Sequence, residues 1–255
     1  MIRYVRQSLL RAALVCAGVF APAVLAAQEN CAPTMTAETS AGAMVQLSIS
    51  SECHAGSEAV IHHNGMMISV RLDENGSYKM NFPAMTESAL FMLEFPDGNV
   101  AIASAEVASL SFYDRVALQW QGDAGLELHA YEFGAEFNSE GHVWRQNPRS
   151  MDHAALGEGG FIVNLGNGTG ENAYGAEVYT FPSATSRQSG RVSLSVEAVV
   201  SEGNCGQTVE ASALNAKQDQ GLNVRNLTIE IPECDAVGDI LVLNNLVEDL
   251  IIGSN

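Results

Sequence analysis

Short segments that alternate apolar and polar residues, separated by turn residues, dominate the chain between residues 44 and 107. Successive side chains of a β-strand point to opposite faces, so such alternation predicts half-buried strands. Asn-Gly, Asp-Glu-Asn-Gly and Pro-Asp-Gly-Asn between the segments are typical hairpin and loop sequences. Six closely spaced strands predict an antiparallel β-sandwich. The predicted strands are 44–50, 58–63, 66–72, 77–82, 89–95 and 100–107.

The remainder of the chain repeats this pattern, so we predict an all-β protein. Its predicted strands are 115–121, 126–133, 142–144, 160–165, 176–181, 191–200 and 224–231. The chain is long enough for one large sandwich or two small domains. We place a boundary near residue 112, between an Ig-like β-sandwich (28–112) and a second β-rich domain (113–255), although one continuous sandwich fits equally well. Residues 239–252 fit a helix or a hairpin, and we favour strand or hairpin.

The first 27 residues have the composition of a secretory signal peptide. Three arginines precede an apolar run that closes on the small residues of AVLAA. Basic, apolar and small-residue regions in this order are typical of a cleaved signal. A membrane anchor would need about 20 continuous apolar residues, and Pro22 interrupts the run. We therefore expect a mature protein in the periplasm or outside the cell, with no membrane span after cleavage.

The charge of the mature chain excludes some classes of partner. The sequence has 12 basic and 30 acidic residues, and three basic residues lie in the predicted signal peptide, which leaves nine against 30 and a formal charge of −21. Nucleic-acid binding needs clustered Lys and Arg that displace counterions, but the nine remaining cations are scattered. Anionic membrane surfaces are disfavoured for the same reason. Cationic partners are compatible with the charge.

Four cysteines remain after cleavage, at positions 31, 53, 205 and 234. An even number in an oxidising compartment indicates disulfides, and three pairings are open. The local pairing of Cys31 with Cys53 and Cys205 with Cys234 would close two short loops, each worth about 3 kcal/mol in the chain-entropy model. No Cys-x-x-Cys spacing is present, so a structural role outweighs a zinc ligand or a nucleophile.

The stretch HHNGMM, residues 62–67, predicts a hairpin, because Asn and Gly accept the positive φ angles of a type I′ turn. In that register His63 faces Met66 on the apolar face of the sheet, and His62 faces Met67 on the polar face. Imidazole and thioether groups bind cuprous copper, so the four residues are also soft-metal candidates. Because the two pairs point away from each other, we favour a plain hairpin.

A second cluster of reactive residue types lies between 126 and 144. If 126–133 is a strand, Glu127 and His129 share one face, and Glu132 lies on the other. His129 and His142 on adjacent strands are candidates for a zinc pair or a catalytic site, with Glu132 as a further candidate. Paired carboxylates would also suit a glycoside hydrolase, and the segment supplies Glu127, Glu132, Glu136 and Glu140. The alternative is a half-exposed strand without a site.

Recognisable catalytic motifs are missing from the sequence. It contains no Gly-x-Ser-x-Gly, His-Glu-x-x-His or EF-hand pattern. The glycine-rich segment 157–175 lacks the Lys-Ser/Thr of a phosphate-binding loop and carries acidic residues. We therefore assign no catalytic residue.

Two stretches resemble known groups of proteins. DENGSYKMNFP, residues 73–83, resembles small Ig-like or transthyretin-like modules of bacterial surface proteins, through its acidic turn, Gly, Tyr and closing Pro. RVALQWQGDAGLELHAYEFGAEF and GHVW are similar to uncharacterised exported bacterial proteins, some automatically labelled "translocase". That label implies transport, but the mature sequence offers neither a spanning segment nor a nucleotide-binding loop in its support.

These observations give three hypotheses. The favoured one is a non-enzymatic, exported β-sandwich module that binds or scaffolds an envelope protein or glycan. The second is a glycan-active hydrolase that uses carboxylates near 127–140. The third is a soft-metal carrier that uses the 62–67 hairpin. We expect no cofactor for the favoured function.

Overall fold

The computed structural model describes residues 31–166, 170, 172–218 and 220–253, which belong to one compact unit beginning at Cys31. The predicted signal peptide, residues 1–27, lies outside the described residues. The all-β prediction is confirmed, because strands dominate the described residues and every strand pairing is antiparallel. In this part of the chain, no helix is both long and apolar enough to cross a membrane.

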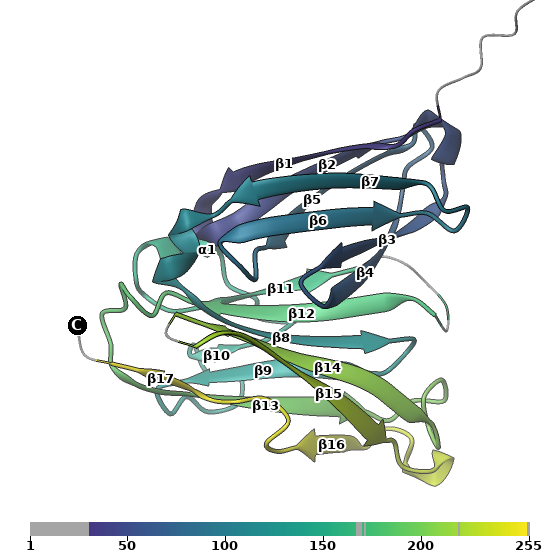
Figure 1. Ribbon diagram of the computed structural model, residues 1–255. Helices are drawn as coiled ribbons and strands as arrows, with labels where there is room; N and C mark the ends of the chain where they lie inside the picture. The colour runs from purple at the N-terminus through teal and green to yellow at the C-terminus, as the bar shows by residue number, and fades with distance from the viewer. Residues whose placement is uncertain (1–30, 167–169, 171, 219, 254–255) are drawn as a thin grey trace, which may run out of the picture. The chain divides into compact units, whose positions relative to one another are not determined.

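Two sheets built from residues 34–106 face each other across a shared core (Figure 1). The first has the order β1-β2-β5 and contains β1 (Thr34–Ser40), β2 (Met44–Ser50) and β5 (Ser77–Pro83). The second has the order β4-β3-β6-β7 and contains β4 (Met66–Arg71), β3 (Glu58–His63), β6 (Ser88–Glu94) and β7 (Val100–Glu106). Short 3₁₀ turns connect some of these strands at Ala41–Ala43 and Glu52–His54, and another follows them at Ala108–Phe112.

Two further sheets form from Asp114 onward. One has the order β11-β12-β8-β14-β15, with β11 (Phe161–Leu165), β12 (Tyr174–Phe181), β8 (Asp114–Gln121), β14 (Thr208–Lys217) and β15 (Gly221–Glu230). The other has the order β10-β9-β13-β16, with β10 (His142–Val143), β9 (Leu126–Glu132), β13 (Gly190–Val199) and β16 (Ile240–Leu243). β17 (Leu250–Ile252) also pairs with β13. The helix α1 (Met151–Ala155) and a 3₁₀ turn at Cys234–Ala236 complete the described elements.

The predicted register of the 62–67 hairpin is confirmed. Asn64 and Gly65 have φ angles of 48° and 91°, as a type I′ turn requires. His63 pairs with Met66 and His62 with Met67. His63 and Met66 are buried, whereas His62 and Met67 are half-buried on the other face.

The apolar side chains form two main cores. One lies between the first two sheets and also contains residues of β8, β11, β12 and β14. The other lies between the sheet of β8 and the sheet of β9. The first core contains side chains from before and after residue 112, so residues 28–112 do not form it by themselves. The two-domain division stays a prediction.

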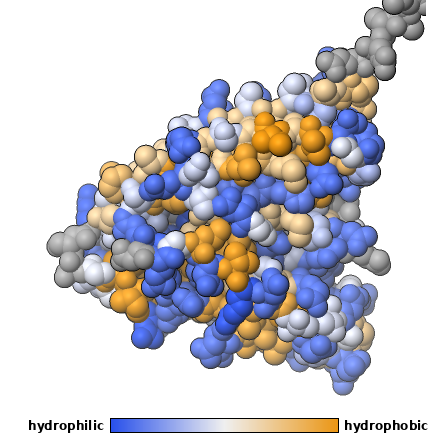
Figure 2. Space-filling view, viewed as in Figure 1, coloured by the Kyte–Doolittle hydropathy of each residue, from blue (hydrophilic) through white to orange (hydrophobic). Residues whose placement is uncertain are grey.

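The surface shows the same alternation from outside. Figure 2 shows an apolar patch over β6 and β7, where Leu90, Val100 and Ile102 are exposed. Their sequence neighbours Phe91 and Ala101 are buried in the core. β6 and β7 therefore each carry apolar side chains on both faces, one face buried in the core and the other exposed to solvent.

Both disulfides follow the local pairing. Cys31 is bonded to Cys53, and Cys205 is bonded to Cys234. The first ties the chain preceding β1 to the turn after β2, and the second ties the chain preceding β14 to the turn after β15.

The tail forms strands, which confirms the favoured prediction of strand or hairpin over helix, but the two strands do not form a hairpin. β16 and β17 each pair with β13, at residues 196–199 and 190–192 respectively, and not with each other. On this side of β13, residues 193–195 therefore pair with none of the described strands.

Candidate functional site

The outward side of the sheet β10-β9-β13 gathers the polar residues of β9. Leu126, Leu128 and Ala130 enter the core, so the alternate residues point away from it, as predicted. Strand register then adds residues from both neighbours, because Tyr131 pairs with His142, His129 with Ser195 and Glu127 with Glu197. We call this surface the outer face. It consists of Glu127, His129, Tyr131, His142, Ser195 and Glu197.

Aromatic rings cover the two histidines of the outer face. The ring centroids of Tyr131 and His142 lie 4.5 Å apart with planes 2° from parallel. Trp144 stacks on both His142 and His129, at 5.2 and 4.8 Å. Phe137, which is 56% exposed, lies 5.0 Å from His142. The stack buries both imidazoles on a face that otherwise meets solvent.

Hydrogen bonds fix the proton positions of the two histidines. The backbone N–H of Asn138 donates to Nδ1 of His142 at 3.0 Å, so this nitrogen is an acceptor. The neutral His142 ring must then carry its proton on Nε2, which lies 2.9 Å from Nδ1 of His129 and donates to it. The neutral His129 ring consequently carries its proton on Nε2.

Both imidazoles are neutral near pH 7. Burial, and secondarily the nearby Arg145, lowers the pKa of His129 to about 4. Burial, and secondarily His129, lowers the pKa of His142 to about 4. The hydrogen bonds therefore run in one direction, from the Asn138 N–H to His142 and from His142 to His129.

This chain ends at two carboxylates. Nε2 of His129 lies 3.5 Å from Oε2 of Glu127 and 3.7 Å from Oε2 of Glu197. Both distances exceed those of an ordinary hydrogen bond, and this buried nitrogen has no hydrogen-bond partner among the residues that the structure describes. Burial, and then the charge of Glu127, raises the pKa of the Glu197 carboxyl, whereas a hydrogen bond from Tyr131 lowers it.

Arg145 compensates the pair only in part. Its Nε lies 2.7 Å from Oε1 of the buried Glu177 and 3.8 Å from Oε1 of Glu127. Glu177 also accepts the backbone N–H of Leu128 at 2.6 Å, and burial raises the pKa of its carboxyl. The guanidinium of Arg145 therefore pairs more closely with Glu177 than with Glu127.

The structure does not bring Glu132 to the histidines. Glu132 points to the opposite side of β9, where its Oε1 accepts from the Tyr179 hydroxyl at 2.6 Å and from the Gly160 N–H at 2.7 Å. Its Oε2 accepts from Arg149 at 2.7 Å. Glu136 and Glu140 are exposed in the loop after β9. Of the four predicted glutamates, only Glu127 belongs to the outer face.

Neither predicted metal site gains ligands from the fold. Nδ1 of His142 and Nδ1 of His129 accept hydrogen bonds, and both Nε2 atoms carry protons, so a zinc ion would have to break the chain. Nδ1 of His63 donates to the Leu90 carbonyl at 2.8 Å, and its Nε2 accepts the Met85 N–H at 2.9 Å. Across the described ranges, no group of three or more His, Cys, Asp or Glu side chains is arranged for a metal. Metal titration remains the test of both hypotheses.

A cavity of about 500 Å³ adjoins the outer face where β13 lacks a partner. The chain between β16 and β17 bends away here, and Asp249 accepts the N–H of Leu194 at 2.8 Å in place of a strand. Its polar lining combines the hydroxyl and amide groups of Tyr131, Ser193, Ser195, Asn244 and Asn245 with the charged side chains of Arg191, Glu248 and Asp249. Tyr131 and Ser195 belong both to the outer face and to the cavity lining, so the outer face and the cavity form one continuous surface.

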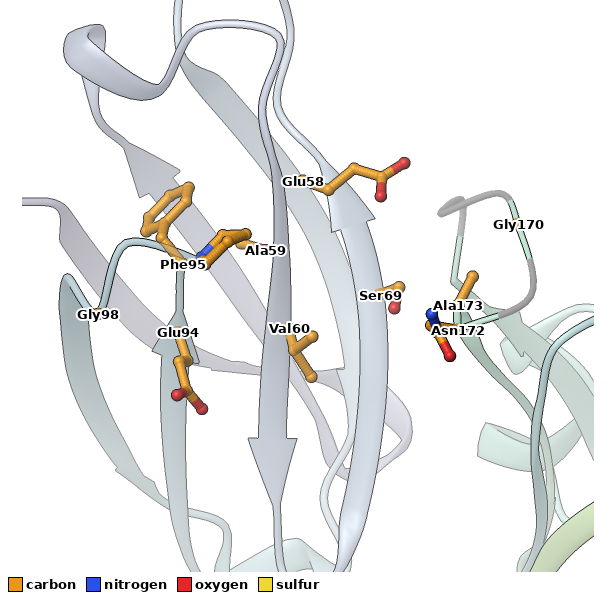
Figure 3. Close-up of a pocket in the computed structure, with 11 residues that line it drawn as sticks. Glu58, Ala59, Val60, Ser69, Glu94, Phe95, Gly98, Gly170, Asn172 and Ala173 are labelled. Atoms are coloured by element: carbon orange, nitrogen blue, oxygen red, sulfur yellow. The ribbon is translucent and has the colours of Figure 1, made fainter.

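Another cavity, of about 520 Å³, lies beside β3, β4 and β6 (Figure 3). Figure 3 shows Val60 and Ser69 on one side and Ala173 on the other. Its two glutamates are already paired, Glu58 with Arg71 at 2.8 Å and Glu94 with His62 at 3.1 Å. It offers fewer uncompensated polar groups than the outer face.

A row of Ser51, His54 and Asp97 has the residue types of a hydrolase triad. Ser51 Oγ lies 2.6 Å from His54 Nδ1, and His54 Nε2 lies 2.9 Å from Asp97 Oδ2. However, Ser51 is only 5% exposed, and Phe95 stacks on the His54 ring at 3.9 Å. The row ties the end of β2 to the β6–β7 turn.

A scan against protein-family models and a search of curated proteins gave no match to the chain. The functional assignment therefore rests on the geometry of the outer face and its cavity.

Acidification should destabilise the protein between pH 6.5 and about 4. Burial lowers the pKa of His63, like those of His129 and His142, from 6.5 to about 4. In this window the unfolded chain binds more protons than the folded one, so the free energy of unfolding falls as pH falls. We expect His63 alone to contribute about 2 kcal/mol of this loss at pH 4.5, measured by urea unfolding against pH 7.

The variant His63→Gln is the control for this prediction. Glutamine keeps one donor and one acceptor for Leu90 and Met85 but does not titrate. Its loss of stability between pH 7 and 4.5 should be smaller than that of the wild type. Equal losses in the two proteins would contradict the assignment.

Proposed function

We propose that the protein is an exported, non-enzymatic module of the bacterial envelope that binds a glycan across the outer face and the adjoining cavity. The observation that carries the proposal is one continuous surface with stacked rings, two carboxylates and a cavity lined by hydroxyl, amide and charged groups. The predicted signal peptide and the two disulfides support an oxidising location.

The chemistry of this surface suits a sugar chain. Carboxylates accept hydrogen bonds from sugar hydroxyls, while serine and asparagine side chains both donate and accept. Aromatic side chains supply apolar contacts beside them. Adjacent strands are about 4.8 Å apart, so a ligand that crosses β10, β9, β13 and the cavity would span about 15 Å. That length suits a short oligosaccharide better than a single sugar.

A glycan array tests the proposal. The mature protein should bind a defined set of oligosaccharides, and Ser193→Trp, which fills the cavity from an exposed strand position, should abolish that binding. Thr228→Trp is the matched control, because Thr228 is exposed on β15 of a different sheet. Absence of binding to every glycan, or equal binding by both variants, would refute the proposal.

One observation favours a hydrolase as the second candidate. Glu127 and Glu197 lie directly opposite each other, and the raised pKa of Glu197 suits a general acid beside a second carboxyl group. The test is incubation of the mature protein with a bound glycan and measurement of new reducing ends. Release that Glu197→Gln abolishes would establish the hydrolase, whereas binding without release would reject it.

A further inference from the structure

We infer that the group bound between Glu127 and Glu197 is a protonated amine, so that the ligand is an amino sugar. The inference rests on the proposed glycan function and specifies its ligand class. It derives from the charges around the carboxylate pair and from the groups that line the neighbouring cavity.

Within the described part of the chain, Arg145, 3.8 Å from Glu127, compensates the carboxylate pair only in part. Like charges directly opposite each other on antiparallel strands destabilise a sheet. Glu127 and Glu197 occupy such positions, and their side chains are only partly exposed, at 18% and 13%. Arg145 lies closer to Glu177 than to Glu127. A bound cation would supply the missing compensation.

His129 points to the same place. Its ring is fully buried, and its Nε2 faces both carboxylates without a hydrogen-bond partner. The donor chain from Asn138 leaves a proton on this atom, so His129 offers a donor and not a lone pair. A metal ion would need that lone pair to gain a third ligand, whereas an ammonium group needs only the carboxylate acceptors.

An ammonium group matches the remaining geometry. Its three N–H donors can be shared between two carboxylates. The Tyr131 hydroxyl, which bonds Glu197, adds a polar group beside the position. The adjoining cavity presents Ser193, Ser195, Asn244 and Asn245, which suit hydroxyls of the sugar that carries the amine.

Calorimetry with a matched pair of ligands tests the inference at pH 6. The glucosamine trimer should bind the mature protein at least tenfold more tightly than its fully N-acetylated counterpart, since acetylation removes the charge, leaves one N–H donor on each nitrogen and adds an acetyl group. Glu127→Gln and Glu197→Gln should each reduce this preference to less than threefold. Glu210→Gln on β14 removes the same charge outside the site and should retain the full preference for the glucosamine trimer. This control separates binding at the site from general attraction of a cationic ligand to an acidic protein.

The outcomes separate this inference from the proposed function. If both trimers bind equally and Ser193→Trp abolishes binding, the glycan face stands and the amine is wrong. If neither trimer binds while other glycans do, the amine is also wrong. If Glu210→Gln weakens binding as much as Glu197→Gln, the attraction is unspecific and the inference fails. The comparison of the two trimers on the wild type does not depend on any variant folding.

Discussion

Replacement of Arg115 by alanine should lower the free energy of unfolding by about 3–5 kcal/mol. Arg115 is fully buried on β8, and its Nε donates to Thr180 Oγ1 at 3.1 Å. Its terminal nitrogens donate to the carbonyls of Ala84 and Gly42. Among the described residues, no carboxylate lies within ion-pair distance of it. Alanine would leave a cavity and strip these acceptors of their donors.

The guanidinium stays charged at neutral pH, because burial lowers its pKa only to about 9. Backbone carbonyls therefore stabilise it in place of an acid. Arg115→Met fills most of the volume without donors, so we expect it to recover part of the loss, and urea unfolding measures the difference. The exposed Arg187→Ala should change stability by less than about 0.5 kcal/mol. A methionine variant as stable as the wild type would show that these hydrogen bonds contribute nothing.

Glu132→Ala should cost about 3–5 kcal/mol, because it removes the acceptor of a buried network. Tyr179, Gly160 and Arg149 all donate to this carboxylate. Burial, and secondarily Glu132, raises the pKa of the Tyr179 hydroxyl well above its usual value, so this group remains a donor that needs an acceptor. The measurement is denaturant unfolding at pH 7.

Two matched variants separate this network from the loop beside it. Glu136→Ala and Glu140→Ala remove exposed carboxylates a few residues away and should change stability by less than about 0.5 kcal/mol. Glu132→Gln should also be destabilising, because an amide can present an acceptor to only one of the two donor sets. Equal stability of all three alanine variants would contradict the described network.

The sequence was enough to predict those features whose geometry depends only on residues close together in the chain. The Asn64-Gly65 turn fixes its own register, so the pairing of His62 with Met67 was predictable. Alternation along β9 separated His129 from Glu132 for the same reason. The sequence left three disulfide pairings open, and the structure has the local one.

Long-range pairing could not be predicted, and it supplies half of the candidate site. Glu197 reaches Glu127 only because β13 pairs with β9, and no residue near either strand encodes that register. The partner gap at 193–195 arises because β16 and β17 pair separately with β13. β14 escaped prediction because alanine, serine and asparagine weaken its strand signal, although Val209, Ala211 and Ala213 alternate.

The most direct test is chemical-shift mapping of the ¹⁵N-labelled mature protein titrated with the glucosamine trimer. We expect saturable shifts at Glu127, Tyr131, Ser195, Glu197 and Asn245, with little change at the cavity beside β3 and β4. Shifts centred on that other cavity, or no shifts with this or any array glycan, would contradict a ligand site on the outer face.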